Sequence, residues 1–182
     1  MLKEVQLIEG TRHFDHRGYF TETYSQKLFK ENGIFDHFVQ DNESLSVEKG
    51  TLRGLHFQAP PHAQAKLVRC VQGSIFDVAV DIRACSPSYG QWVGYELSAE
   101  NGHQLYIPTG FAHGFLALTT NTKIVYRCSD YYAPESEGSL RWDDPDINVQ
   151  WPMSGQPIVS FKDEAADSFA AFESPFTLEG AV

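Results

Sequence analysis

The stretch LVRCVQGSIFDVAVDIR, residues 67–83, contains two apolar runs separated by Gly73 and Ser74. In the second run the residues alternate, so a strand would place on one face Phe76, Val78, Val80 and Ile82. Its other face would carry Ile75, Asp77, Ala79 and Asp81. β-Branched and aromatic residues on either side of a glycine turn are typical of paired strands. We therefore predict a β-hairpin across this stretch.

The same pattern recurs along the chain. Short apolar runs occupy residues 92–97, 104–108, 114–118 and 122–132, and turn-rich segments separate them. Short strands at this spacing are typical of barrels and sandwiches, and closure into a barrel removes exposed sheet edges. The sequence predicts an all-β fold, a barrel or jelly roll, in one domain spanning residues 1–182.

Two segments favour short helices at the periphery. Ser25 is a candidate N-cap for a helix of about two turns with Leu28 and Phe29 pointing inward. Near the C-terminus, Ser160 and Asp163 stand at the spacing of a capping box and precede an alanine-containing segment. This pattern predicts a terminal helix that covers one end of the barrel.

Composition bounds the location and the class of ligand. No run of about 18 apolar residues indicates a membrane span and no signal peptide is apparent, so we expect a cytoplasmic protein. Cys70, Cys85 and Cys128 form no C-x-x-C pair, so we expect reduced thiols. The formal net charge of −10 argues against nucleic acid or an anionic membrane as a partner. An anionic ligand would need a local basic cluster.

The segment TLRGLHFQ, residues 51–58, places Arg53 and His56 inside an apolar strand, where unpaired polar groups are costly to bury. Their odd spacing would point them to opposite faces of a regular strand. We hypothesise that Gly54 forms a bulge that turns both toward the barrel mouth. A structural hydrogen bond for His56 and a surface ion pair for Arg53 explain the residues equally well.

The segment PTGFAHGF, residues 108–115, has the P-x-G-x-x-H form of the second cupin motif and includes His113. Metal-binding cupins also need H-x-H followed by a glutamate, but here His56 stands alone and no glutamate follows closely. Two histidines fall short of the three or more protein ligands typical of such sites. We therefore predict no catalytic metal, although His62 remains a spare candidate ligand.

Three further residues have ordinary explanations when each is taken alone. Lys66 fits a strand-end lysine in water, and Tyr126 shares a strand face with apolar neighbours and fits core packing. Asp163 fits an acidic residue in the first turn of a helix.

Taken together, several segments resemble the dTDP-4-dehydrorhamnose 3,5-epimerase family. They are residues 52–58, 65–83, 86–101, 107–118 and 126–147, with DHRGYFTE (15–22) and VQDN (39–42) upstream. The resemblance implies a cupin-type jelly-roll barrel with a few short peripheral helices and no cofactor. It implies conversion of dTDP-4-dehydro-6-deoxy-D-glucose to dTDP-4-dehydro-L-rhamnose by inversion at C3 and C5, both next to the C4 ketone, through enolates.

The resemblance also assigns roles to residues of this chain. His56 would be the base, with Asp163 as its orienting partner, and Lys66 would stabilise the enolate oxygen. Tyr126 would return a proton from the opposite side. The positions that match substrate contacts in the family are Arg17, Glu22, Gln40, Asn42, Arg53, His113, Glu137 and Lys162. Phe20 and Tyr132 would stack on the thymine ring.

The family is dimeric, and the resemblance implies that the N-terminal region of one subunit helps to complete the site of its neighbour. Arg17, Phe20 and Glu22 would then act in trans. Three rivals stay open on the sequence: an epimerase that inverts only C3 or only C5 of a related dTDP-ketosugar, a non-catalytic sugar-binding cupin, and a metal-dependent cupin enzyme.

Overall fold

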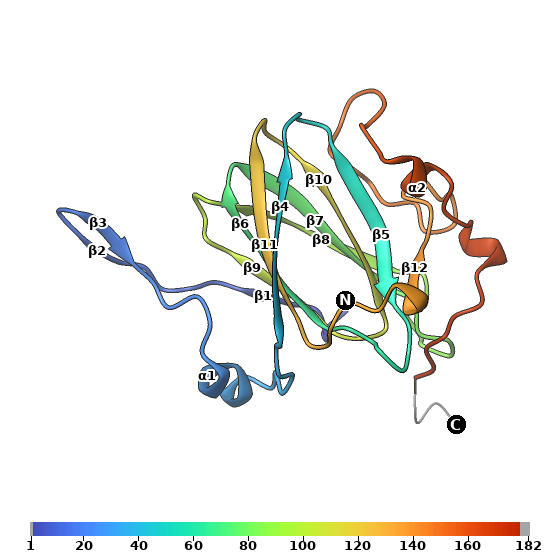
Figure 1. Ribbon diagram of the computed structural model, residues 1–182, viewed down its shortest axis with the longest axis horizontal. Helices are drawn as coiled ribbons and strands as arrows, with labels where there is room; N and C mark the ends of the chain where they lie inside the picture. The colour runs from blue at the N-terminus through green and yellow to red at the C-terminus, as the bar shows by residue number, and fades with distance from the viewer. Residues whose placement is uncertain (1, 179–182) are drawn as a thin grey trace.

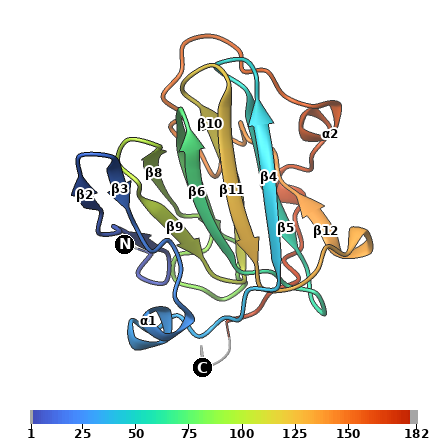
Figure 2. The ribbon, with the colours of Figure 1, turned by 60° about the vertical axis from the view of Figure 1, so that its left-hand side comes forward.

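The computed structural model describes residues 2–178, which form two five-stranded sheets and a separate two-stranded hairpin. The strand order of the first sheet is β1 (Gln6–Ile8), β9 (Gln104–Ile107), β6 (Lys66–Gln72), β11 (Thr122–Cys128) and β4 (Gln40–Ser46). That of the second is β12 (Glu137–Ser139), β5 (Leu52–Gln58), β10 (Phe111–Ala117), β7 (Ser74–Asp81) and β8 (Trp92–Ser98). Neighbouring strands pair antiparallel. The two sheets face each other (Figure 1), and Figure 2 shows β6, β11 and β4 of the first side by side.

This architecture confirms the predicted all-β jelly roll with short peripheral helices, but the predicted hairpin across residues 67–83 is wrong. β6 pairs with β9 and β11, whereas β7 pairs with β8 and β10 of the opposite sheet. The chain changes sheets at Gly73, which has a φ of +76°. A Cβ at this position would lie 2.3 Å from Oγ1 of Thr119, so only glycine fits this sharp corner.

The predicted alternation along β7 is correct, and both of its faces are buried. Ile75 and Ala79 belong to the core between the sheets, together with residues of the first sheet such as Val68 and Ile124. The opposite face belongs to a second core that includes Val78, Val80 and Ile82, closed by aromatic residues of the C-terminal segment such as Trp151 and Phe172. Burial on both faces explains why apolar residues occur on both faces of the strand.

The N-terminal helix has about the predicted length, whereas the C-terminal helix is shorter than the sequence predicted. α1 (Gln26–Glu31) packs Phe29 on a small core, but Leu28 is 48% exposed and the side chain of Ser25 makes no capping hydrogen bond. The C-terminal region forms a one-turn helix, α2 (Phe161–Glu164), and two 3-10 turns, η1 (Pro134–Ser136) and η2 (Phe169–Ala171). The capping prediction holds in part, because Ser160 Oγ accepts a hydrogen bond from the backbone N–H of Asp163.

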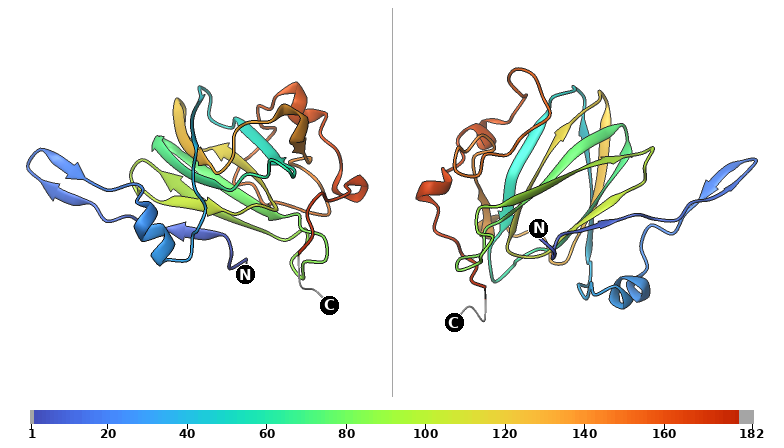
Figure 3. Two further views of the ribbon diagram at one scale, coloured as in Figure 1. Left: turned by 60° about the horizontal axis from the view of Figure 1, so that its bottom comes forward. Right: turned by 180° about the vertical axis from the view of Figure 1, so that it is seen from behind.

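Strands β2 (His13–Asp15) and β3 (Gly18–Phe20) form a hairpin that projects from the barrel (Figures 1 and 3). Its aromatic side chains Phe14, Tyr19 and Phe20 are 73%, 52% and 72% exposed. Elsewhere, Cys70, Cys85 and Cys128 are free thiols, as expected. No helix within residues 2–178 is both long enough and apolar enough to cross a membrane.

Candidate active site

Two adjoining cavities of about 290 and 340 Å³ lie between the sheets, and His56, Lys66, Tyr126 and Glu137 line both. Lys66 and Tyr126 project from the first sheet, whereas His56 lies on β5 of the second. A ligand in this space would therefore meet the imidazole on one side and the ammonium and phenol on the other.

A β-bulge places Arg53 and His56 on the same cavity, as hypothesised. His56 pairs with His113 and Arg53 pairs with Phe115, so β5 contains one more residue than β10 across this interval. Gly54 sits in the bulge with a φ of +130°, and a Cβ there would lie 2.5 Å from the Cα of Gly114. Both side chains line the smaller cavity.

His56 is paired with a buried carboxylate. Its Nε2 lies 2.6 Å from Oδ1 of Asp163, whose side chain is only 4% exposed. Burial raises the pKa of Asp163, but the hydrogen bonds from His56 and Ser160 outweigh it and hold the pKa below its ordinary value. The ionised carboxylate accepts the Nε2 proton, so the lone pair of the neutral ring lies on Nδ1. The pair is suited to proton abstraction by His56.

Lys66 and Tyr126 lie in partly buried positions that perturb both groups. Burial lowers the pKa of Lys66, while electrostatic interactions with Cys128, Asp77 and Glu137 act in the opposite direction. Burial raises the pKa of Tyr126, so the phenol holds its proton more firmly than in water. A protonated phenol can donate a proton, and an ammonium stabilises developing negative charge on oxygen.

A polar cluster forms the outer wall of the larger cavity. The carboxylate of Glu137 lies 2.6 Å from the ammonium of Lys162 and accepts a 2.9 Å hydrogen bond from the Tyr132 hydroxyl. Burial raises the pKa of Glu137, but these two contacts outweigh it and hold the pKa below its ordinary value. The side chain of Gln40 accepts from the Tyr132 backbone and donates to Asn42 at 3.0 Å. The structure thus links these five predicted contact residues: Gln40, Asn42, Tyr132 and Glu137 line the larger cavity, and Lys162 lines the smaller one.

The histidine of the cupin motif forms a second, buried His–Asp pair. Nε2 of His113 lies 2.7 Å from Oδ1 of Asp77. The charge of Asp77 opposes the effect, but burial dominates and lowers the pKa of His113, which favours the neutral ring. Within residues 2–178, no group of three or more His, Cys, Asp and Glu side chains is arranged to hold a metal ion.

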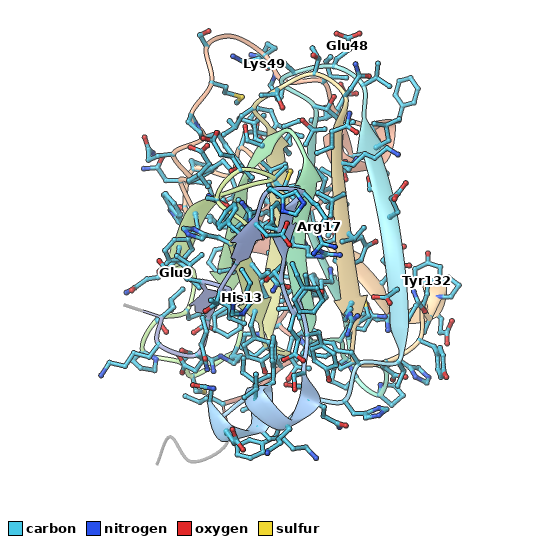
Figure 4. All side chains as sticks on the ribbon, turned by 90° about the vertical axis from the view of Figure 1, so that its left-hand side faces the viewer. Glu9, His13, Arg17, Glu48, Lys49 and Tyr132 are labelled. Atoms are coloured by element: carbon cyan, nitrogen blue, oxygen red, sulfur yellow. The ribbon has the colours of Figure 1, made fainter. Side chains whose placement is uncertain are left out.

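Three predicted contact residues lie away from this cavity in the single chain. Arg17 is on the projecting hairpin, where it pairs with Asp15 at 2.5 Å, and Phe20 and Glu22 line a different cleft beside α1. Figure 4 shows Arg17 on the hairpin in front of the first sheet and Tyr132 beyond β4. A single chain therefore does not place all of the predicted substrate-contact residues around one cavity.

The sequence model of the dTDP-4-dehydrorhamnose 3,5-epimerase family matches residues 1–171. The chain belongs to this family. It is 52% identical over 166 residues to the family enzyme of Salmonella typhimurium, covering 91% of this chain and 90% of that one. It is 49% identical over 175 residues to that of Sinorhizobium fredii, covering 96% and 90%.

A solved member of the family has the same fold. The crystal structure of dTDP-6-deoxy-D-glucose-3,5-epimerase from Legionella pneumophila, in complex with dTDP-4-keto-L-rhamnose, superposes with a TM-score of 0.92 at 46% identity. The match covers 97% of this chain and 94% of that one.

Beyond the residues predicted from the family resemblance, the cavity walls contain Ser44, Gln58, Gln64, Phe115, Cys128 and Ser160. Asp77 behind the wall was also missed as a candidate. The available signal was its place between Ile75 and Ala79 on the same strand face, which marks a buried acid in need of a partner.

Proposed function

We propose that this protein epimerises dTDP-4-dehydro-6-deoxy-D-glucose at C3 and C5 to form dTDP-4-dehydro-L-rhamnose. Its relatives are named dTDP-4-dehydrorhamnose 3,5-epimerase, which supports the proposal. The observation that carries the proposal is the arrangement of the side chains that line both cavities between the sheets. A base, His56, faces an acid, Tyr126, from the opposite sheet, with Lys66 beside the acid.

The chemistry requires this arrangement. Protons on C3 and C5 are acidic because each carbon adjoins the C4 ketone. Nδ1 of His56 would remove one such proton, and the electron pair would move onto the ketone oxygen as an enolate beside the Lys66 ammonium. Tyr126 would then deliver its proton to the same carbon from the opposite face, which inverts the centre.

Each inversion leaves His56 protonated and Tyr126 ionised, so the two groups must exchange protons with solvent before the next one. The buried Asp163 stabilises the imidazolium in that interval. A general acid or base of this kind contributes about 10²- to 10⁴-fold in rate.

The nucleotide diphosphate would be held by basic side chains around the cavity mouth. Arg53 and Lys162 line the smaller cavity and form charge-assisted hydrogen bonds with phosphate readily. His113 and Glu137 would contact the sugar part, and Gln40, Asn42 and Tyr132 border the larger cavity, where Tyr132 would stack on thymine. This local cluster is what an anionic ligand needs on a chain with a net charge of −10.

The remaining contacts would come from a second copy of the chain. The exposed hairpin carries Arg17 and Phe20 away from its own cavity, and Glu22 follows directly. We propose a cytoplasmic homodimer in which these residues complete the neighbouring site. The proposed reaction uses side chains throughout and assigns no step to a metal or cofactor.

A coupled assay tests the function. The protein is supplied with dTDP-4-dehydro-6-deoxyglucose, a 4-ketosugar reductase and NADPH, and the product is identified as dTDP-rhamnose. Proton NMR in deuterium oxide should show exchange at both C3 and C5. Exchange at only one carbon would instead identify a mono-epimerase, and no exchange would indicate a binding protein.

A further inference from the structure

Asp77 is a buried acid that the proposed reaction does not use. It lies near the middle of β7, is 0% exposed, and shares its strand face with Ile75 and Ala79 of the core between the sheets. One carboxylate oxygen contacts His113, and within residues 2–178 the other oxygen has no hydrogen-bond partner.

Such a group is expensive to retain. A buried carboxylate loses its hydration, and a single neutral hydrogen bond does not restore that free energy. The neighbours on the same face are apolar, and apolar side chains in place of a buried ionic pair are often neutral or stabilising. Core stability therefore does not explain why this position holds an acid. A nearby positive charge would explain it.

Within residues 2–178, Lys66 is a half-buried cation of the cavity that forms no ion pair of its own. Within the described residues its ammonium forms no salt bridge. The titratable and charged groups around it are Cys128 and Tyr126 of β11, Glu137 of β12, His56 and Arg53 of β5, His113 of β10, Asp77 of β7, and Lys162 and Asp163 of α2. Most of these groups cannot balance the positive charge of Lys66.

Burial raises the pKa of the Cys128 thiol and of the Tyr126 phenol, which keeps both neutral. The carboxylate of Glu137 is already paired with Lys162 at 2.6 Å. The carboxylate of Asp163 is engaged by His56 at 2.6 Å. Asp77 is the anion in this group with a carboxylate oxygen that has no hydrogen-bond partner within residues 2–178, and burial lowers the pKa of its partner His113 toward the neutral ring.

We propose that Asp77 is a positioning residue for the epimerisation: its buried carboxylate keeps the Lys66 ammonium charged and holds His113 in the tautomer that donates from Nε2. The inference rests on the proposed function, in which Lys66 must be cationic to stabilise the enolate. Asp77 touches no substrate and acts through these two side chains.

The first test is the pH profile of kcat/KM for Asp77→Asn, which keeps the shape and removes the charge. Without the carboxylate the pKa of Lys66 falls further, so the alkaline limb should move to lower pH by about one unit, as expected for loss of a nearby opposite charge. The matched control is Asp81→Asn on the same strand, also 0% exposed but paired with Arg83 at 2.8 Å outside the cavity. Its limb should stay in place.

A folded Asp77→Asn protein with an unmoved alkaline limb, or an equal shift in Asp81→Asn, overturns the proposal. Melting temperatures of Lys66→Met, Asp77→Asn and the double variant provide a second test that does not need activity. If the two charges support each other, the double variant should melt higher than the sum of the single losses predicts. Additive losses, or a double variant that fails to fold when Lys66→Met folds, overturn the proposal.

Failure of the two ideas can be told apart. If the unaltered protein makes no epimerised product but the melting temperatures are non-additive, the proposed function is wrong and the pairing of Asp77 with Lys66 stands. If the unaltered protein is active, but the alkaline limb of the pH profile does not move in Asp77→Asn and the losses in melting temperature are additive, only the role of Asp77 is wrong.

Discussion

Asp163→Asn tests the His–Asp base directly. The substitution keeps the size of the side chain and removes its negative charge from a position 2.6 Å from Nε2 of His56. An ion pair at about 4 Å between charge centres is worth on the order of 4 kcal/mol at the effective dielectric of a partly buried site. Part of that energy is available only once His56 becomes an imidazolium, that is, in the transition state.

We therefore expect kcat to fall by about 10²- to 10³-fold, with KM changed by only a few-fold, because an interaction made after proton transfer affects kcat. The coupled reductase assay measures both constants. The fold should survive, because the helix cap uses the backbone N–H of residue 163 and not its side chain.

Ser160→Ala is the matched control for Asp163→Asn. It removes the capping hydroxyl of α2, which costs about 0.5–2 kcal/mol of stability, but leaves the carboxylate next to His56. Its kcat should fall far less. An Asp163→Asn enzyme with kcat within about threefold of the unaltered protein would refute the role of the carboxylate, since general-base catalysis is worth at least about 10²-fold.

Three further outcomes follow from the structure. Tyr126→Phe should lose about 10²-fold or more in epimerisation while substrate protons still exchange into deuterium oxide, because His56 can return a deuteron to the face it deprotonated; NMR that shows normal inversion would contradict this. Mixing inactive Arg17→Ala and His56→Ala proteins should restore up to about a quarter of the sites if the hairpin acts in trans in a dimer, whereas no recovery after proven subunit exchange argues for sites within one chain. Gly54→Ala should destabilise the fold by about 2–5 kcal/mol, since positive φ and overpacking add; Gly155→Ala has a φ of +86° but open space, so thermal melting should show a smaller loss there.

The sequence alone determined the features that depend on near neighbours in the chain. Alternation along residues 75–82 assigned each side chain to the correct face, and the odd spacing around Gly54 predicted the bulge. Local spacing also predicted the cap at Ser160. These are short-range geometric consequences of backbone period and side-chain size.

The roles of the site residues came from resemblance, since nothing local relates His56 to Asp163. These two residues are 107 positions apart, and taken singly both have ordinary explanations. The resemblance itself rested on motifs across almost the whole chain, and the family match over residues 1–171 bears it out.

Only the tertiary structure decided which strands pair and which charges meet. Local sequence predicted a hairpin at Gly73, but pairing depends on the partners available to each edge, and β6 and β7 found theirs in opposite sheets. The sequence assigned Asp77 only to a strand face, and its role became apparent when folding placed it against His113 and near Lys66. Electrostatic energy depends on distance and burial in space, which separation along the chain does not encode.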